Sequence, residues 1–256
     1  MRLRDKVVIV TGATGGIGRA IAARAVAEGA RVLVHGIDAA AGARTVAELG
    51  GAAALHLEDL VDPDAGGRIV AAALRAFGRV DAVVNNAALV ARSTLATASA
   101  AGFDRMMAIN VRAPLLLIQA AWPELRAHRG CIVNIGSINA LSGEATLLDY
   151  SVSKGALQTL SRNLANAHAA DGVRCNHLNV GWVLTEREHV MQVSEGQPPD
   201  WHERLPAVFA PSGRLLRPEE VAAAAVYLLA EESGPVNGAV IELEQYSLHG
   251  RNPVKV

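Results

Sequence analysis

Short apolar runs alternate with longer segments of helical periodicity along nearly the whole chain. The runs are rich in β-branched residues and poor in polar ones, which is typical of parallel strands that helices cover on both faces. They predict strands at residues 6–11, 31–35, 53–57, 81–85, 130–136, 173–179 and 238–243. The intervening patterns predict helices at residues 17–28, 39–49, 64–77, 104–128, 149–170 and 217–231.

This order of elements predicts an α/β fold: a single Rossmann-like, doubly wound parallel sheet of about seven strands with helices on both faces. No linker rich in Pro or Ser and no charge block divides the chain, so we expect residues 1–256 to form one domain. Residues 185–212 interrupt the alternation, because four prolines and Gly196 lie there among polar residues. We expect this segment to form a lid over a substrate site.

A glycine-rich turn follows the first predicted strand. Residues 11–18 read Thr-Gly-Ala-Thr-Gly-Gly-Ile-Gly and lead directly into a helical pattern. Glycines permit positive φ and let phosphates approach the backbone, and the N-terminus of the next helix offers unpaired N–H groups and a positive dipole end. An ordinary loop can also be glycine-rich, but this position between a buried strand and a helix predicts a site for a dinucleotide pyrophosphate.

Tyr150 and Lys154 lie four residues apart in an Ala-rich helical segment, so they share one helix face. A free phenol ionises near pH 10, so a tyrosine that acts as a base near pH 7 needs a pKa shift of about 3 units, or ~4 kcal/mol. A lysine at i+4 together with a cationic cofactor ring can supply that shift. The pair alone also fits an ordinary solvent-facing helix.

With both segments in view, the sequence resembles the short-chain dehydrogenase/reductase family, whose members carry a Thr-Gly-x-x-x-Gly-x-Gly turn and a Tyr-x-x-x-Lys helix in this order. The resemblance covers essentially the whole chain. Ala88 stands where the family usually has Gly, and Val180 stands where it usually has Pro. The other matching segments are residues 83–87, 109–111, 132–137, 179–185, 213–221 and 237–238.

The resemblance implies a catalytic set of Asn110, Ser137, Tyr150 and Lys154. Tyr150 would exchange a proton with the reacting oxygen, Ser137 would hydrogen-bond that oxygen, Lys154 would lower the pKa of Tyr150 and hold a ribose hydroxyl, and Asn110 would anchor a water. Chemistry independently calls for such groups, since hydride transfer moves no proton and an alcohol oxygen needs a positioned acid or base. The implied activity is NAD(P)-dependent interconversion of a secondary alcohol and a ketone.

The resemblance also implies a set of cofactor contacts around the glycine turn and the carboxyl ends of the strands. They are Gly12, Thr14, Gly16, Ile17, Gly18, Gly36, Asp38, Asp59, Leu60, Asn86, Ala87, Tyr150, Lys154, Gly181, Val183 and Thr185.

The choice between NAD and NADP depends on the end of the second strand. Gly36 stands where an acidic residue would bind the adenosine ribose, and Ile37 stands where an arginine would meet a 2′-phosphate. A 2′-phosphate would have only two candidate partners, His35 and a more distant arginine such as Arg19. A ribose diol tolerates neutral surroundings better than a phosphate does, and Asp38 could reach it, so NAD is favoured over NADP. Asp38 could instead cap the following helix.

Substrate contacts are expected from Ser137, Asn139, Glu144, Tyr150, Trp182 and His189. No cluster of Arg or Lys marks a phosphate or a carrier-protein arm, which favours a small neutral polyol, sugar or hydroxy-ketone. A reductase of 3-oxoacyl groups linked to acyl carrier protein or CoA is one alternative. A non-catalytic nucleotide sensor or scaffold on the same fold, and a Rossmann-type enzyme of unrelated chemistry such as a methyltransferase, are the others.

Composition narrows the possible partners. With 24 Lys and Arg against 25 Asp and Glu the net charge is −1, which gives no electrostatic footprint for nucleic acid or an anionic membrane. The N-terminus leads into a strand without a signal-peptide core, so we expect a cytoplasmic protein. Cys131 and Cys175 lie in predicted strands and read as core thiols, and the eight histidines show no metal-ligand spacing, so we expect no metal. Members of the family pair the helices that correspond to residues 104–128 and 149–170, which implies a homotetramer.

Overall fold

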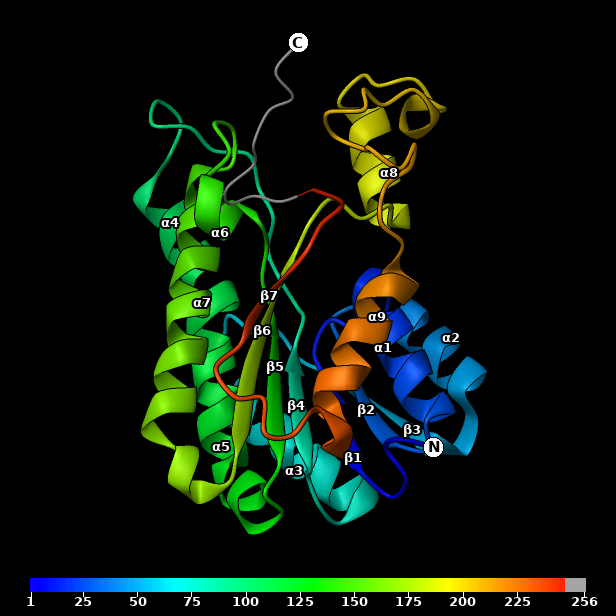
Figure 1. The fold of residues 1–256 in the computed structure, drawn as a ribbon, viewed down its shortest axis with the longest axis vertical. Coiled ribbons are helices and arrows are strands. Elements are labelled where there is room, and N and C mark those ends of the chain that lie inside the picture. The colour runs from blue at the N-terminus through cyan, green and yellow to red at the C-terminus, as the bar shows by residue number, and fades with distance from the viewer. Residues whose placement is uncertain (247–256) are drawn as a thin grey trace.

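A single open sheet organises the computed structural model, which describes residues 1–246. Its seven strands are all parallel and lie in the order β3-β2-β1-β4-β5-β6-β7, which confirms the predicted fold class (Figure 1). The strands are β1 Val7–Val10, β2 Arg31–Gly36, β3 Ala53–Leu57, β4 Ala82–Asn85, β5 Cys131–Ile135, β6 Arg174–Val180 and β7 Val240–Leu243.

Helices cover both faces of the sheet. The α-helices are α1 Gly16–Ala27, α2 Ala39–Leu49, α3 Ala65–Phe77, α4 Ala100–Met107, α5 Ala113–Ala127, α6 Asn139–Ser142, α7 Leu148–Ala167, α8 Glu186–Ser194 and α9 Pro218–Leu229. In Figure 1, α5 and α7 lie on one side of the sheet and α1, α2 and α9 on the other. Among residues 1–246, no helix is both long enough and apolar enough to cross a bilayer.

Successive residues of each central strand pack into two different apolar layers. Val8 and Val10 of β1 belong to the layer under α1 and α9, whereas Ile9 belongs to the layer under α3 and α5. Side chains alternate across a strand, so a strand that is covered on both faces buries every position and favours apolar residues throughout. This is why β1 appears in the sequence as an uninterrupted apolar run.

The helix predicted at residues 104–128 differs in two ways. It begins earlier, at Ala100, because the Ser99 hydroxyl accepts the Gly102 N–H at 3.1 Å and caps the first turn. It also contains a π-helical turn, Ala108–Arg112, between α4 and α5, and Asn110 lies in that turn. Such wide turns often occur at functional sites.

The segment predicted as a lid contains regular structure. α8 begins after Thr185, whose hydroxyl accepts the Glu188 N–H at 3.0 Å, and a short 3₁₀ turn, η4, spans Trp201–Glu203. The sequence prediction missed α8 because the helix has no apolar face wide enough to produce a periodic pattern. In Figure 1 the lid stands over the carboxyl ends of the strands, on the α9 side.

Candidate active site

The glycine turn lies between β1 and α1, at the point where the order of the strands reverses. Gly12 and Gly16 have positive φ, +63° and +50°. A Cβ on Gly18 would lie 2.2 Å from the Gly12 carbonyl oxygen and 2.4 Å from Asn86 Nδ2, so only glycine lets α1 approach the turn this closely. In doubly wound sheets, ligands bind in the crevice at this switch point.

The neighbouring strand β4 holds the turn in shape. Asn86 Nδ2 donates to the carbonyl oxygens of Thr11 at 2.9 Å and Gly12 at 3.1 Å, and the Thr11 hydroxyl accepts the N–H groups of Asn86 and Ala87. Asn86 and Ala87, which the resemblance placed against the cofactor, therefore also support the backbone of the turn.

The start of α1 fits a phosphate group. Its N-cap is Gly15, which brings no side-chain acceptor to the first turn, and the first turn contains no acidic residue. The backbone N–H groups there consequently remain available to an anion. Thr185 of the lid comes close to Gly16 from the other side, since a Cβ on Gly16 would lie 3.3 Å from Thr185 Cγ2. These features fit the phosphates of a dinucleotide.

The residues around the end of β2 correct part of the sequence interpretation. His35 is fully buried, its Nε2 lies 3.1 Å from the Glu58 carbonyl oxygen, and burial lowers its pKa to about 4. His35 is therefore neutral at physiological pH and cannot serve as the cation for a 2′-phosphate. Arg19, the other candidate, pairs with Glu48 at 3.2 Å.

The predicted contacts to adenosine have local structural roles as well. Asp38 caps α2 and accepts the Ala41 N–H at 2.9 Å, as the alternative interpretation expected. Asp59 accepts the Val61 N–H at 3.0 Å, and Leu60 is buried in the core. Gly36 packs against Thr14, since a Cβ on Gly36 would lie 2.4 Å from Thr14 Cγ2.

A cavity of about 940 Å³ opens between the ends of the strands and the lid. It brings together most of the residues that the sequence assigned to chemistry and to the substrate. Its predicted lining residues are Ile17, Asn86, Ser137, Asn139, Glu144, Tyr150, Lys154, Gly181, Trp182, Val183 and Thr185. Ala88, Leu147, Val180 and Trp201 line it too.

Tyr150 and Lys154 point into this cavity from one face of α7, and Ser137 follows β5. Burial raises the pKa of Tyr150 to about 12, and a hydrogen bond with Ser137 opposes that rise. Lys154 Nζ donates to the Ile135 carbonyl oxygen at 2.8 Å and lies 5.6 Å from the centroid of the Tyr150 ring. Burial lowers the pKa of Lys154 to about 8. In the protein alone burial outweighs the effect of the neighbouring groups. The lower pKa that Lys154 and a cationic cofactor ring together would give Tyr150 stays a prediction.

Asn110 is buried in the π-helical turn, and its side chain is already bonded. Its Nδ2 donates to the Leu89 carbonyl oxygen at 2.9 Å and to Ser153 Oγ at 3.0 Å, and its Oδ1 accepts the Leu89 N–H at 2.8 Å. These bonds connect the loop after β4 to the helix that carries Tyr150 and Lys154. The side chain therefore also fixes the relative position of the two elements.

A chain of polar side chains lies beneath the site. His177 of β6 is completely buried, with Nδ1 2.9 Å from Ser161 Oγ and Nε2 3.0 Å from Asn179 Oδ1. Asn179 in turn donates to Gln158 Oε1 at 2.6 Å, one helical turn after Lys154. Burial lowers the pKa of His177 to about 3, and the charge of Lys154 adds to this effect. His177 is thus a neutral hydrogen-bonding group.

His189 is the predicted substrate residue that does not line the cavity. Its ring packs against His202, with the centroids 5.5 Å apart. Each residue of an α-helix is rotated about 100° from the one before it, so the residue after Glu188, which faces the cavity, points elsewhere. The substrate contact expected of His189 stays a prediction that the cavity lining does not support.

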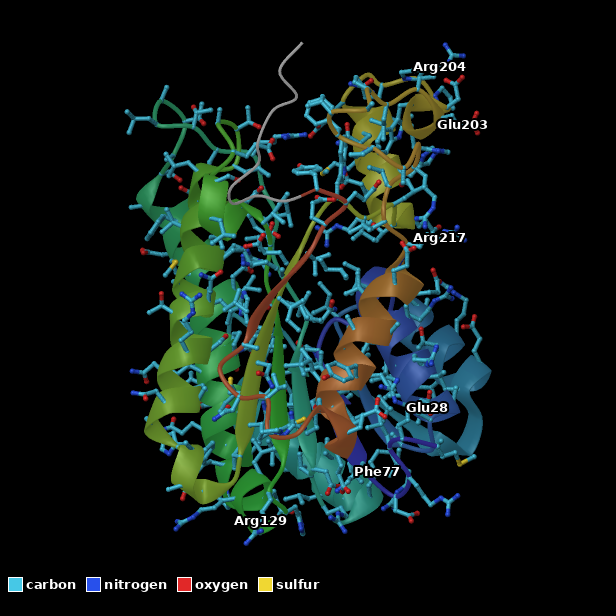
Figure 2. All side chains as sticks on the ribbon, viewed as in Figure 1. Glu28, Phe77, Arg129, Glu203, Arg204 and Arg217 are labelled. Atoms are coloured by element: carbon cyan, nitrogen blue, oxygen red, sulfur yellow. The ribbon has the colours of Figure 1, made fainter. Side chains whose placement is uncertain are left out.

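The lid supplies cavity residues that the sequence analysis missed: Glu188, Met191, Gln192, Arg204 and Phe209. Glu188 and Gln192 lie four apart and so share one face of α8, but this spacing became informative only once the helix was known. Figure 2 places Arg204 and Glu203 at the outer end of the lid.

Arg92, which follows β4, forms an ionic bridge between the lid and the body of the protein. Its Nε lies 3.0 Å from Glu195 Oε1 at the end of α8, and its Nη2 donates to the other oxygen of the same carboxylate. Its Nη1 reaches Glu144 at 3.4 Å and Thr146 at 3.1 Å. We call this group the Arg92 bridge. It engages Glu144, which the sequence analysis assigned to the substrate.

Known proteins are similar in sequence to this chain over almost their full length. The family model described as Enoyl-(Acyl carrier protein) reductase matches residues 12–244. A 2-(S)-hydroxypropyl-CoM dehydrogenase of Xanthobacter autotrophicus is 33% identical, with 95% of this chain and 96% of the relative covered. A meso-2,3-butanediol dehydrogenase of Serratia marcescens is 32% identical, with 95% of each chain covered.

Solved structures agree with these sequence matches. One is described as a short chain dehydrogenase/reductase family protein, at 32% identity and a TM-score of 0.84, with 95% of this chain and 97% of the other covered. The crystal structure of L-sorbose reductase from Gluconobacter frateurii, complexed with NADPH and L-sorbose, has a TM-score of 0.89 at 26% identity and the same coverage. The chain belongs to the short-chain dehydrogenase/reductase family and is a nicotinamide-dependent oxidoreductase that acts on CH–OH groups.

Proposed function

We propose that the protein interconverts a secondary alcohol and a ketone within a small neutral polyol, sugar or hydroxy-ketone. The observation that carries the proposal is the cavity in which Ser137, Tyr150 and Lys154 meet aromatic walls. Both arginines in its lining are paired with carboxylates, Arg92 with Glu195 and Arg204 with Asp200. The cavity thus offers apolar surface and hydrogen bonds rather than a site for a strongly anionic group. The similarity to a meso-2,3-butanediol dehydrogenase and to a reductase that binds L-sorbose supports this substrate class.

The glycine turn fits the pyrophosphate of a nicotinamide dinucleotide, and the cavity fits its nicotinamide half. Residues 12–18 and the first turn of α1 would hold the pyrophosphate, and Asn86, Lys154, Gly181 and Thr185 would hold the nicotinamide half. When bound, the dinucleotide supplies the acceptor or the donor of the hydride. NAD is the favoured form, because His35 is buried and neutral and the end of β2 offers a 2′-phosphate no arginine of its own, while Arg19 lies on Glu48.

In this proposal Tyr150 handles the proton. In ketone reduction its hydroxyl gives a proton to the new alkoxide oxygen, and in alcohol oxidation the phenolate takes the proton of the substrate hydroxyl. Ser137, which hydrogen-bonds Tyr150, would donate to the same substrate oxygen. The ammonium of Lys154 would stabilise the phenolate electrostatically and bind a ribose hydroxyl. Asn110 would keep the helix with Tyr150 and Lys154 in place against the loop after β4.

A reductase of carrier-linked 3-oxoacyl groups is the second candidate, and the description of the matching family model favours it. The phosphate groups of such substrates need unpaired cations, whereas Arg92 and Arg204 are paired. A non-catalytic sensor would have no need for Asn110, Ser137, Tyr150 and Lys154 together.

The proposal is tested by following the nicotinamide absorbance with a panel of polyols, sugars, hydroxy-ketones and 3-oxoacyl thioesters, each with NAD and NADP. We expect turnover of a neutral substrate. Tyr150→Phe should lower kcat by ~100- to 10,000-fold while the dinucleotide Kd stays within a factor of about three, because the ring still fills its place. Turnover of thioesters alone would favour the second candidate, and a Tyr150→Phe rate within a few-fold of wild type would remove Tyr150 from the mechanism.

A further inference from the structure

Glu188, in the first turn of α8, is held in one position at the wall of the cavity. Its Oε1 accepts two hydrogen bonds, from Trp182 Nε1 at 2.8 Å and from Gln192 Nε2 at 2.9 Å. Trp182 belongs to the loop after β6, and Gln192 lies one helical turn further along α8. The three side chains, all in the cavity lining, therefore connect the lid to the body of the protein.

The carboxylate of Glu188 keeps the capacity to accept more hydrogen bonds. An ionised carboxylate has acceptor sites for about four, and the two donors above share a single oxygen. Both donors are neutral, so they do not cancel the negative charge. The other acidic residues of the cavity lining have different partners, since Glu144 lies on Arg92 and Glu244 accepts the Gln245 N–H at 2.7 Å.

Glu188 lies in the same cavity as the reaction centre. Glu188 and Tyr150 both belong to the cavity lining, and the charge of Glu188 adds to burial in raising the pKa of Tyr150. A substrate that reacts at Tyr150 can therefore present a second hydroxyl group to Glu188.

Next to Glu188 the wall is aromatic. The rings of Trp182 and Trp201 stack with centroids 5.3 Å apart, and Phe209 meets Trp182 edge-on at 6.3 Å. An aromatic surface beside a single acceptor suits a ligand that has both C–H faces and hydroxyl groups. The carboxylate of Glu188 in the same place repels anions, and it gives a purely hydrocarbon chain nothing to bind.

We propose that Glu188 binds a second hydroxyl group of the substrate, and that the cavity is built for a neutral substrate with at least two hydroxyl groups. This inference rests on the proposed function, because the reacting carbon is the one beside Tyr150. Glu188 is a specificity-determining residue in this proposal, and Trp182 and Gln192 are the positioning residues that orient it.

The decisive experiment compares three probes that differ at one carbon: 2,3-butanediol, 2-butanol and 3-amino-2-butanol. We expect the wild-type enzyme to have a kcat/KM for the diol at least ~100-fold above that for 2-butanol, since a site built to bond a hydroxyl discriminates strongly against its absence. Glu188→Ala and Glu188→Gln should each reduce that ratio by ~10- to 100-fold, mainly through a higher KM for the diol. The kcat/KM for 2-butanol, which lacks the second hydroxyl group, should change less than that for the diol.

The matched control is Glu186→Gln. Glu186 lies in the same first turn of α8 but is exposed, so this variant loses the same charge at the helix N-terminus without touching the cavity. It should keep the wild-type ratio. A second measurement separates a local structural effect from substrate binding: removal of the Glu188 charge should shift the pH profile of 2-butanol oxidation to lower pH, and Glu186→Gln should not shift it.

The outcomes distinguish the two proposals. An unchanged ratio in both Glu188 variants, with wild-type thermal stability and dinucleotide affinity, would overturn the role of Glu188, and a preference for 3-amino-2-butanol would overturn the neutral substrate class. Absence of turnover for every alcohol would overturn the proposed function. In that case, titration of galactitol into the enzyme–NADH complex, followed by tryptophan fluorescence, decides separately whether binding depends on Glu188, and equal affinity of wild type and Glu188→Gln would overturn the inference.

Discussion

In the proposed mechanism, the protonation state of the Tyr150 hydroxyl gives the two directions of the reaction different responses to pH. Burial raises the pKa of Tyr150 to about 12, so at neutral pH the side chain is a phenol that can donate a proton. Ketone reduction would use that form, whereas alcohol oxidation would use the phenolate. The two directions should therefore respond to pH in opposite ways.

We expect kcat/KM for alcohol oxidation to rise with pH between pH 6 and 10, by up to tenfold per unit, because the phenolate fraction rises with pH below the pKa. Ketone reduction should not rise over this range. Lys154→Arg should not restore the full oxidation rate, since the larger guanidinium does not fit the buried site where Nζ donates to Ile135. A flat oxidation rate, with chemistry shown to limit turnover, would contradict the phenolate.

The end of β2 gives a second residue-scale prediction. Ile37 is 76% exposed, so Ile37→Arg can present a cation to a 2′-phosphate and should shift the ratio of dinucleotide affinities about tenfold toward NADP, with Ile37→Gln as the neutral control. Gly36→Asp should weaken both dinucleotides, because its Cβ would meet Thr14, and Thr14→Gly should relieve that loss. Direct titrations check both expectations, and unchanged affinities in both variants would show that this end of β2 does not face the adenosine.

At the scale of elements, β6 is unusual because it carries polar side chains into the core. Asn176, His177 and Asn179 are all buried. The cost of burying them is offset by hydrogen bonds to α7 and to the segment before β7, such as Asn176 Nδ2 to the Val236 carbonyl oxygen at 3.0 Å. This network fixes the position of α7, and with it the position of Tyr150 and Lys154.

Acid should destabilise the fold through its two buried neutral histidines. His35 and His177 have pKa values lowered from 6.5 to about 4 and about 3, so below pH 6.5 the unfolded chain binds more protons than the native one. Their stabilising contribution is complete above pH 6.5 and is lost as pH falls, by about 1.4 kcal/mol per pH unit for each histidine. Denaturant titrations between pH 4 and 6.5 should show this slope roughly halved in His177→Asn but retained in the half-exposed control His168→Asn. An equal slope in wild type and His177→Asn would show that His177 is not neutral in the native state.

The sequence predicted best those elements that are buried at every position. β1 is an apolar run for this reason. Tyr150 and Lys154 are conspicuous because their spacing has a chemical meaning. α8 and Glu188 were missed, since the residues of a polar helix receive their roles from partners distant in sequence, here Trp182 and Arg92. The π-helical turn at Asn110 was missed because no residue type encodes it.

At the scale of the whole molecule, we expect a homotetramer with closed two-fold interfaces. Leu115 of α5 and Val152 of α7 are 41% and 47% exposed, apolar positions on the helices that the resemblance assigned to assembly. Light scattering should give a tetramer mass for wild type and for the lid variant Val190→Glu, and a smaller mass for Leu115→Glu combined with Val152→Glu. A monomeric mass for wild type at micromolar concentration would contradict the prediction. The C-terminal residues 245–256 are expected to lie near a neighbouring subunit, and residues 247–256 lie outside the described part of the chain.

We expect the lid to close fully only when dinucleotide and substrate are both present, because closure excludes water from the hydride path. Hydrogen exchange in residues 185–212 should therefore slow markedly in the ternary complex, while exchange in the central strands stays unchanged. Strong protection of this segment without ligands would contradict the prediction.

We expect the Arg92 bridge to make turnover respond to the salt in the medium. Its charged side chains are about one-third to one-half exposed, so dissolved ions screen their attraction within a Debye length of about 8 Å at physiological ionic strength. Bonds of this kind weaken as salt rises, while the aromatic contacts of the same lid do not. If product release limits the rate, added salt should quicken each cycle by opening the lid sooner, and it should also admit more water to the reaction. Speed and protection of the chemistry would then respond to ionic strength in opposite directions.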